Sequence, residues 1–375
     1  MADRGRVLQL STMVPPARHG GAERVVQAFA EQLRAAGFDV HNTGLNARGE
    51  GDAPIPNLYW PFDGRRRSAP ARIAWHAIDA LTPAGRRATE RAIDAVDPQI
   101  VITHNLRGWG LAPWTVAHRR GIPLIHVVHD YGLLCNTSTL WHDGGPCGTA
   151  CRLRAARSIA RWPGGLLVGV SDAVLGEHRR HGFGLTDPSA VIHPVAAAAG
   201  VATTTSNRAG TGNAMPSTFG YLGRLAVEKG IGRLIDAIAA TEATLIVAGE
   251  GEQSAVEDLK ARAPQQVQWW GWADPAQLFD AIDVLVVPSL WREPYGLVVV
   301  EAARAGVPVL IADQPGLVEA ARSCGARYRP FSVDDPAALP TALRAPLDTY
   351  RADPISPPDV DIVDLVAERM TAARP

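Results

Sequence analysis

Short apolar runs alternate with longer segments of helical periodicity along most of this chain. Runs such as Ile100–Thr103, Pro123–Val128 and Val284–Val287 consist mainly of Val, Ile and Leu. A continuous apolar run of this length predicts a strand that is buried on both faces, which is the environment of a parallel sheet. Because helical segments separate the runs, the pattern predicts an α/β protein whose two halves each form a doubly wound sheet.

The predicted elements fall into two groups that a patternless segment separates. Residues 195–216 are mostly small or polar and show neither the periodicity of a helix nor the pattern of a strand, so we predict a linker there. A length of 375 residues is enough for two domains of ordinary size. We therefore expect an N-terminal domain at 1–194, a C-terminal domain at 217–358 and a last helix within 359–375.

Two glutamates follow the predicted strand Val284–Val287. Glu293 lies in the loop after Pro288, and Glu301 lies in a helix that starts near Gly296, on a stretch otherwise made of Val and Ala. A carboxylate is costly to bury without a partner, and ligands of doubly wound sheets bind at the carboxyl ends of the strands. The two carboxylates therefore indicate a binding site, although a solvated helix face would also accommodate Glu301.

The spacing of these glutamates resembles a known signature. Seven residues separate Glu293 from Glu301, and Pro-Tyr-Gly follows the first glutamate directly. Together with the Ala-Gly-Val-Pro-Val segment further on, this resembles the Glu-x7-Glu signature of retaining GT-B glycosyltransferases of family four. The resemblance implies two Rossmann-like domains that face each other across a cleft, with the C-terminal helix packed back on the first domain.

The same resemblance implies roles for the residues of this stretch. Glu293 is expected to act as a catalytic residue that contacts the donor sugar, and Glu301 is expected to hold the ribose hydroxyls. Tyr295, Gly296 and Leu297 are expected to lie beside the donor sugar.

Two cations and two glycines are candidates for binding a diphosphate. Arg224 and Lys229 flank a loop that leads from a predicted strand into a helix, and only two lysines occur in the whole chain. Because nearly all other basic residues of this chain are arginines, a lysine at this position indicates that the loop uses a compact point charge. This loop resembles the family's Gly-Arg-Leu-x-x-x-Lys-Gly phosphate element. Gly20 and Gly21 start another predicted helix, where exposed N–H groups bind anions, unless they form only a tight turn.

Two histidines end successive predicted strands of the first half. His104, with Asn105, follows Ile100–Thr103, and His129 follows Pro123–Val128. The His-Asp pair at 129 resembles the family's acceptor-side histidine, so we expect His129 to be catalytic. His104 and Asn105 are acceptor-side candidates, with a structural hydrogen-bonding role as the alternative for His104.

The loop after His129 contains three cysteines and one histidine. Cys135, His142, Cys147 and Cys151 could form a tetrahedral zinc site, but their spacing matches no strong template. Buried thiols are therefore the preferred interpretation. We expect no metal at the donor diphosphate, because Arg224 and Lys229 are expected to take its place there.

Composition excludes several classes of protein. The net charge is −1, so no overall field favours nucleic acid. No apolar run approaches the ~20 residues of a membrane span, and no secretory signal opens the chain. We expect a cytoplasmic protein with at most peripheral membrane contact. Arg65–Arg67 and Arg72 are candidates for that contact, although a solvated face is the preferred interpretation of these arginines. The oligomeric state stays open.

These observations predict a hexosyltransferase that moves a sugar from a nucleotide-diphosphate donor to an acceptor hydroxyl and retains the anomeric configuration. We expect a UDP-sugar donor, with a GDP-sugar as the alternative, and no further cofactor. Two other classes stay open: another GT-B activity, such as a phosphorylase or a sugar-nucleotide epimerase, and a non-catalytic protein that binds a nucleotide sugar.

Overall fold

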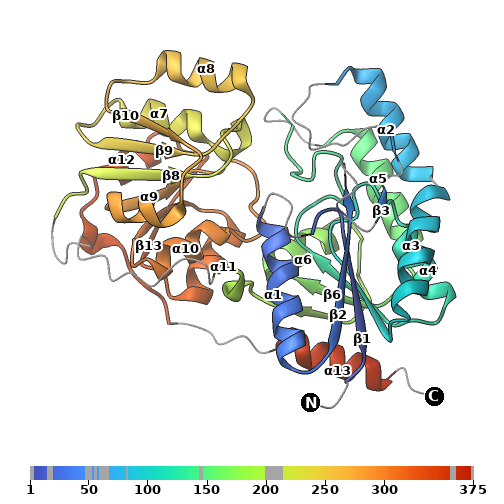
Figure 1. The fold of residues 1–375 in the computed structure, drawn as a ribbon. Coiled ribbons are helices and arrows are strands. Elements are labelled where there is room, and N and C mark those ends of the chain that lie inside the picture. The colour runs from blue at the N-terminus through green and yellow to red at the C-terminus, as the bar shows by residue number, and fades with distance from the viewer. Residues whose placement is uncertain are drawn as a thin grey trace. The chain divides into compact units, whose positions relative to one another are not determined.

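The computed structural model forms two compact units (Figure 1). The first comprises residues 1–138, 147–197 and 358–375, and the second comprises residues 139–146 and 198–357. The residues described are 4–14, 20–46, 53–54, 57–58, 67–81, 83–142, 147–198, 214–354 and 360–372. Among the helices of these residues, none is both long and apolar enough to cross a membrane.

The first unit is built on a seven-stranded parallel sheet in the order β3-β2-β1-β4-β5-β6-β7. Its central strands are buried on both faces, since Val7, Leu8 and Leu10 are fully covered. The strands are β1 (Arg6–Ser11), β2 (Asp39–Asn46), β3 (Ala53–Pro54), β4 (Ile100–Thr103), β5 (Leu124–Val128), β6 (Leu166–Gly169) and β7 (Ser189–Val191).

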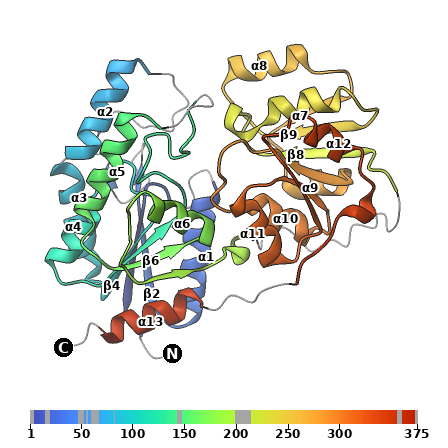
Figure 2. The ribbon, with the colours of Figure 1, turned by 180° about the vertical axis from the view of Figure 1, so that it is seen from behind.

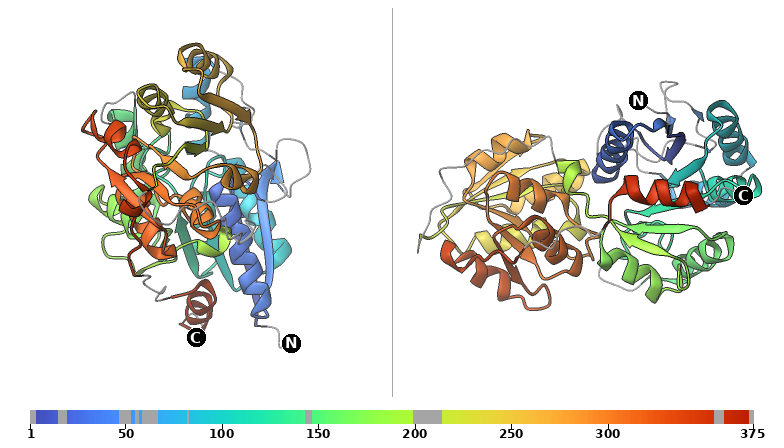
Figure 3. Two further views of the ribbon diagram at one scale, coloured as in Figure 1. Left: turned by 90° about the vertical axis from the view of Figure 1, so that its left-hand side faces the viewer. Right: turned by 90° about the horizontal axis from the view of Figure 1, so that it is seen from below.

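Helices lie on both faces of this sheet (Figures 1 and 2). Helix α1 buries Val25, Val26, Phe29 and Leu33, which share one face at helical spacing. The C-terminal helix α13 contacts α1 and β4, and Figure 3 shows this helix in red. The helices are α1 (Gly21–Ala35), α2 (Ala69–Leu81), α3 (Pro83–Val96), α4 (Ala112–Arg119), α5 (Thr149–Arg161), α6 (Asp172–Arg180), the 3₁₀ turn η1 (Val195–Ala198) and α13 (Ile362–Ala372).

The second unit is built on a six-stranded parallel sheet in the order β10-β9-β8-β11-β12-β13. Its strands are β8 (Thr218–Leu222), β9 (Thr244–Ala248), β10 (Val267–Gly271), β11 (Val284–Val287), β12 (Val309–Ala312) and β13 (Tyr328–Phe331). Its helices are η2 (Val227–Lys229), α7 (Ile231–Ile238), α8 (Gln253–Arg262), α9 (Pro275–Ala281), α10 (Leu297–Arg304), α11 (Pro315–Cys324), α12 (Ala338–Leu343) and η3 (Leu347–Thr349).

Each sheet has one place where the strand order reverses. In the first sheet the reversal lies between β1 and β4, and in the second it lies between β8 and β11. The crossovers on the two sides of such a point run in opposite directions, so the loops after the two strands separate and leave room for a ligand. The topology therefore singles out the loops that follow β1 and β4, and those that follow β8 and β11.

The predicted α/β class with two doubly wound sheets is confirmed. Two regions differ in detail from the sequence expectations. Residues 45–75, for which the sequence analysis names no helix or strand, contain the end of β2, all of β3 and the start of α2, and it does not name β13 either. Most of the predicted linker, residues 199–213, lies outside the described residues, as do Arg65 and Arg66.

Candidate active site

The reversal point of the second sheet brings two loops together. The first loop follows β8 and ends in η2, and the second follows β11 from Pro288 to Gly296. The N–H of Leu290 donates to the carbonyl of Glu228 at 2.9 Å, which ties the second loop to the first. Gly230 makes the close approach possible, because a Cβ there would lie 1.8 Å from the carbonyl oxygen of Pro288.

A lysine from one loop meets a glutamate from the other. The Lys229 Nζ lies 2.6 Å from Glu293 Oε1, and the Ser289 hydroxyl donates to the same oxygen at 2.7 Å. The side chain of Glu293 is 8% exposed and that of Lys229 is 22% exposed. The ammonium also lies 4.8 Å from the centre of the Trp291 ring, a cation–π contact. A nearly buried carboxylate is thus neutralised by a lysine that still reaches solvent.

The helix after this loop carries the second glutamate. Glu301 is buried on α10, and Gly296 precedes the helix with a φ of 107°. Tyr295 is buried, and its hydroxyl lies 2.7 Å from the Ser323 hydroxyl. Burial raises the pKa of Tyr295, so this phenol stays neutral. Leu297 begins α10 directly after Gly296. The predicted donor-sugar and ribose residues are therefore neighbours along one loop and the helix that it starts.

Arg224 occupies a more open position than Lys229. Its side chain is 64% exposed, and its guanidinium donates to Glu228 Oε1 at 2.8 Å. The backbone beneath it is held by the Tyr221 hydroxyl, which donates to the Arg224 carbonyl at 2.6 Å. The two predicted phosphate cations thus have separate carboxylate partners and different solvent exposure.

In the first unit, the predicted glycine pair lies at the start of α1. Gly20 is the N-cap residue and Gly21 is the first helical residue. The Gly20 N–H donates to Glu23 Oε2 at 2.8 Å, so a carboxylate of the same helix already uses one of the donors assigned to an anion. The N–H of Gly21 belongs to the first helical turn, where donors have no intrahelical acceptor.

A chain of hydrogen bonds holds the two histidines at the carboxyl ends of β4 and β5. The Nδ1 of His104 lies 2.8 Å from the Nε2 of His129, and the Nε2 of His104 lies 2.9 Å from the Oε1 of Gln9. The amide of Gln9 donates to Asn42 Oδ1 at 3.0 Å and to the Val26 carbonyl at 3.2 Å. Register explains the assembly, since Gln9 is paired with Asn42 across β1 and β2.

This chain determines which nitrogen of each ring carries the proton. The Gln9 oxygen faces His104, so the Nε2 of His104 must be the donor to it. The Nδ1 of a neutral His104 is then an acceptor, and the Nε2 of His129 donates to it. Burial lowers the pKa of His129 to about 3, and burial together with the His129 ring lowers that of His104 well below its usual range. A neutral His129 therefore presents its Nδ1 as an acceptor.

Asn105, the other acceptor-side candidate, is held through its backbone. Its carbonyl accepts from the N–H and the hydroxyl of Thr12, at 2.7 and 2.9 Å. Thr12 follows β1 and Asn105 follows β4, so this contact joins the two loops at the reversal point of the first sheet.

The sequence analysis did not identify three of the residues that build these clusters. Gln9 is polar and fully buried within the apolar run of β1, a signal that could have marked it. Ser289 and Trp291 lie in the loop that contains Glu293, but nothing in their spacing indicates contact with Lys229 or Glu293.

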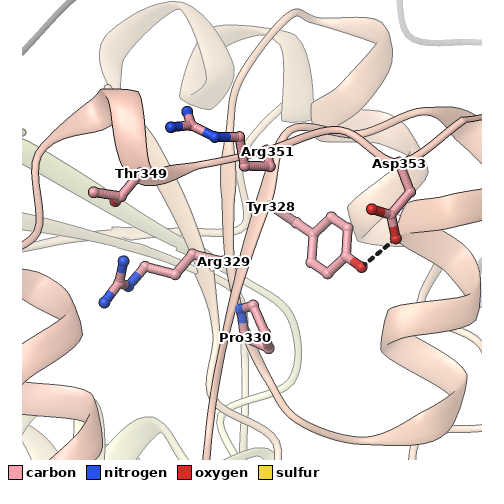
Figure 4. Close-up of a pocket in the computed structure, with 6 residues that line it drawn as sticks. All are labelled: Tyr328, Arg329, Pro330, Thr349, Arg351 and Asp353. Carbon is pink, nitrogen blue, oxygen red and sulfur yellow. Dashed lines mark hydrogen bonds between the residues drawn. The ribbon is translucent and has the colours of Figure 1, made fainter.

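A cavity of about 300 Å³ lies elsewhere in the second unit. Figure 4 shows its lining, in which the Tyr328 hydroxyl donates to Asp353 at 2.8 Å. Tyr328 begins β13, whereas the clusters above follow the carboxyl ends of their strands, and no predicted site residue lines the cavity. The cavity lining is Tyr328, Arg329, Pro330, Thr349, Arg351 and Asp353.

Comparison with known proteins places these clusters in a family context. The family described as "Glycosyltransferase Family 4" matches residues 19–195, and the one described as "Glycosyl transferases group 1" matches residues 216–348. An uncharacterised 42.6 kDa protein of the cps region of Klebsiella pneumoniae is 27% identical, over 84% of this chain and 87% of that protein. The glycogen synthase of Mycobacterium tuberculosis is 28% identical, over 92% of this chain and 86% of its own length.

A solved structure supports the same fold. Alr3699/HepE from Anabaena, crystallised with UDP and glucose, has a TM-score of 0.62 at 18% identity, covering 98% of this chain and all of that chain. Two family matches that lie on the two sheets, and a fold shared over nearly the whole chain, lead to one assignment. The chain belongs to the family-four type of GT-B glycosyltransferases, and it is a glycosyltransferase enzyme.

Proposed function

We propose that this enzyme transfers a hexose from a UDP-sugar to an acceptor hydroxyl with retention of the anomeric configuration. The observation that carries the proposal is the contact between Lys229 and Glu293 at the reversal point of the second sheet. The known relatives support the choice of donor, because Alr3699/HepE was crystallised with UDP and with UDP-glucose.

Lys229 and Arg224 are proposed to bind the diphosphate. Lys229 is held by Glu293 on one side and is 22% exposed, so its ammonium can donate to a phosphate oxygen while the carboxylate keeps it in place. Cleavage of the sugar–phosphate bond builds negative charge on the departing diphosphate. A preorganised ammonium stabilises that charge without reorganisation, which is the largest contribution in many enzymes.

Glu293 and Glu301 are proposed to act on different parts of the donor. Glu293 would lie beside the sugar ring, where positive charge develops as the bond to phosphate lengthens, so the contact strengthens in the transition state. Glu301, on the helix α10, would hold the ribose hydroxyls equally in the ground and transition states. Tyr295, Gly296 and Leu297 connect the two positions.

His129 is proposed to contact a hydroxyl of the donor sugar through its Nδ1. His104 uses both ring nitrogens within the first unit, so it positions His129 and fixes the tautomer. In the transfer itself, the acceptor oxygen bonds to the anomeric carbon as the bond from that carbon to the phosphate oxygen breaks. We propose that the departing phosphate takes the acceptor proton, which balances the step without a protein base.

The test compares nucleotides that differ by one phosphate. Calorimetry with UDP and UMP should show that Lys229→Ala weakens UDP binding by about 10- to 100-fold, the loss of one charge-assisted hydrogen bond. The same change should leave UMP binding within about fivefold, because about 1 kcal/mol or less is at stake without the second phosphate. Lys260→Ala, the only other lysine of the chain, is the matched control.

Equal losses for UDP and UMP, or no loss for either, would contradict this assignment of the phosphate site.

A second measurement tests whether a metal bridges the phosphates. Transfer should persist in a chelator; activity that chelation removes and Mg²⁺ or Mn²⁺ restores would show that a metal bridges the phosphates.

A further inference from the structure

The loop between β5 and α5 gathers four metal-ligating side chains. The three Sγ atoms of Cys135, Cys147 and Cys151 and a ring nitrogen of His142 all lie within 4.8 Å of one another. From these residues we infer that the loop is a structural zinc site with a Cys₃His ligand set. The inference is independent of the donor chemistry proposed above.

The sulfur–sulfur distances distinguish the kinds of site that three cysteines can form. Cys135 Sγ lies 3.6 Å from Cys147 Sγ and 3.5 Å from Cys151 Sγ. A disulfide requires roughly 2 Å, so neither pair is bonded. Two thiolates on one tetrahedral zinc, each at about 2.3 Å, stand about 3.8 Å apart. The ligands of a multi-iron cluster bind different irons and stand farther apart, so the observed distances fit one small ion.

The ligand types select zinc among the common ions. Thiolates and imidazole are the ligands that Zn²⁺ prefers, whereas Mg²⁺ and Ca²⁺ take oxygen. Four protein ligands complete a tetrahedron and leave no position for a substrate or water, which is the arrangement of a structural rather than a catalytic site. Cys151 lies in the first turn of α5, so the ligand set joins the loop to a helix.

The position of the loop indicates what a metal would stabilise. Cys135 is buried, and its N–H donates to the Tyr131 carbonyl at 2.8 Å. The same loop begins directly after His129, and the Ser158 hydroxyl of α5 donates to the Leu133 carbonyl at 2.8 Å. One ion bound to Cys135 and to Cys151 would cross-link the loop to the helix and hold the segment that follows His129 in a single conformation.

Metal analysis of the full chain tests the site. Protein expressed with ample zinc and purified without a histidine tag should contain about one zinc per chain by mass spectrometry, as one tetrahedral site requires. Cys135→Ser, Cys151→Ser and His142→Ala should each lose most of that zinc. Cys324→Ser is the matched control, because Cys324 lies in α11 and its thiol contacts the Ala321 carbonyl at 3.6 Å.

Stability and spectroscopy complete the test. A zinc chelator should lower the melting temperature of the wild type and of Cys324→Ser, and should leave unchanged that of any ligand variant that still folds. If the ligand variants fail to fold, the wild type loaded with Co²⁺ should show thiolate-to-cobalt charge transfer in the near ultraviolet and intense tetrahedral bands in the visible. Wild type without zinc, zinc retained by the ligand variants, or octahedral cobalt bands would overturn the inference.

Discussion

The reversal points of the two sheets carry opposite kinds of chemistry on the same topology. In the second unit the loops after β8 and β11 bring together charges of opposite sign, Lys229 and Glu293 at 2.6 Å. In the first unit, His104 follows β4 at the reversal point and meets His129, which follows the neighbouring strand β5. These are neutral rings, whose pKa values are lowered chiefly by burial. The topology places side chains at an edge of the sheet, and the residue types that follow each strand decide whether the place carries charge.

The two arrangements also respond differently to disturbance. The ion pair depends on having both partners, because a nearly buried carboxylate that loses its cation keeps its desolvation cost. The histidine chain depends on staying neutral, because protonation would place charge on His104, which is buried, or on His129, which is partly buried. Mutation of one partner should therefore damage the second unit most, and acid should damage the first.

The largest effect is expected from separating the ion pair. Lys229→Met should lower the free energy of unfolding by about 2–3 kcal/mol, because Glu293 is left unpaired in a position where its side chain is 8% exposed. Glu293→Gln in the same chain should recover most of that loss without restoring transfer. Denaturant unfolding of both single variants and the double variant measures the coupling, and additive losses would mean that the pair contributes nothing to stability.

The second largest effect is expected on the stability of the protein when the pH is lowered. The unfolded chain protonates a histidine below pH 6.5, whereas the folded protein keeps His104 neutral, since its pKa lies well below that value. Stability is therefore full above pH 6.5 and falls as the pH drops, by up to about 1.4 kcal/mol per pH unit for this residue. The free energy of unfolding, measured between about pH 7.5 and about pH 5.5, should fall less steeply with decreasing pH for His104→Gln than for wild type. The exposed His118, changed to Gln, should leave the slope unchanged.

A smaller effect is expected from the residue that fixes the histidine tautomer. Gln9→Leu removes the acceptor for His104 Nε2 while keeping a side chain of similar size at a fully buried position. The turnover number should fall about fivefold, the effect of one net hydrogen bond, while the affinity for UDP stays unchanged. Gln266→Leu is the control, because the side-chain amide of Gln266 donates to the carbonyls of Ile238 and Thr241 at the end of α7. Weaker UDP binding in Gln9→Leu would show a structural rather than a positioning role.

The smallest effect should come from Arg224. Because its side chain is 64% exposed and Glu228 competes for it, Arg224→Ala should weaken UDP binding only about threefold, within the range of exposed charge pairs. Added salt should reduce the difference further. Arg233→Ala, which removes another arginine that bonds to the Val333 carbonyl, should have no effect. A loss as large as that of Lys229→Ala would give the two cations equal weight.

The sequence by itself determined the strands and the positions that follow them. Val284–Val287 and Ile100–Thr103 are strands at the bounds expected, because apolar runs of that length and composition report burial on both faces. The spacing of Glu293 and Glu301, and the scarcity of lysine, pointed to the second unit before any contact was known. These features are local, so they can be detected along the chain.

The partners of those residues were decided only by the tertiary structure. Lys229 and Glu293 are 64 residues apart, and His104 and Gln9 are 95 residues apart. Each contact exists because two strands became neighbours in a sheet, and the choice of neighbours depends on how all the apolar faces are buried together. Periodicity carries no record of that choice. The spacing of Cys135, Cys147 and Cys151 likewise does not reveal their contact. It is uneven and matches no zinc template, although the fold brings their sulfurs to within 4.8 Å of one another.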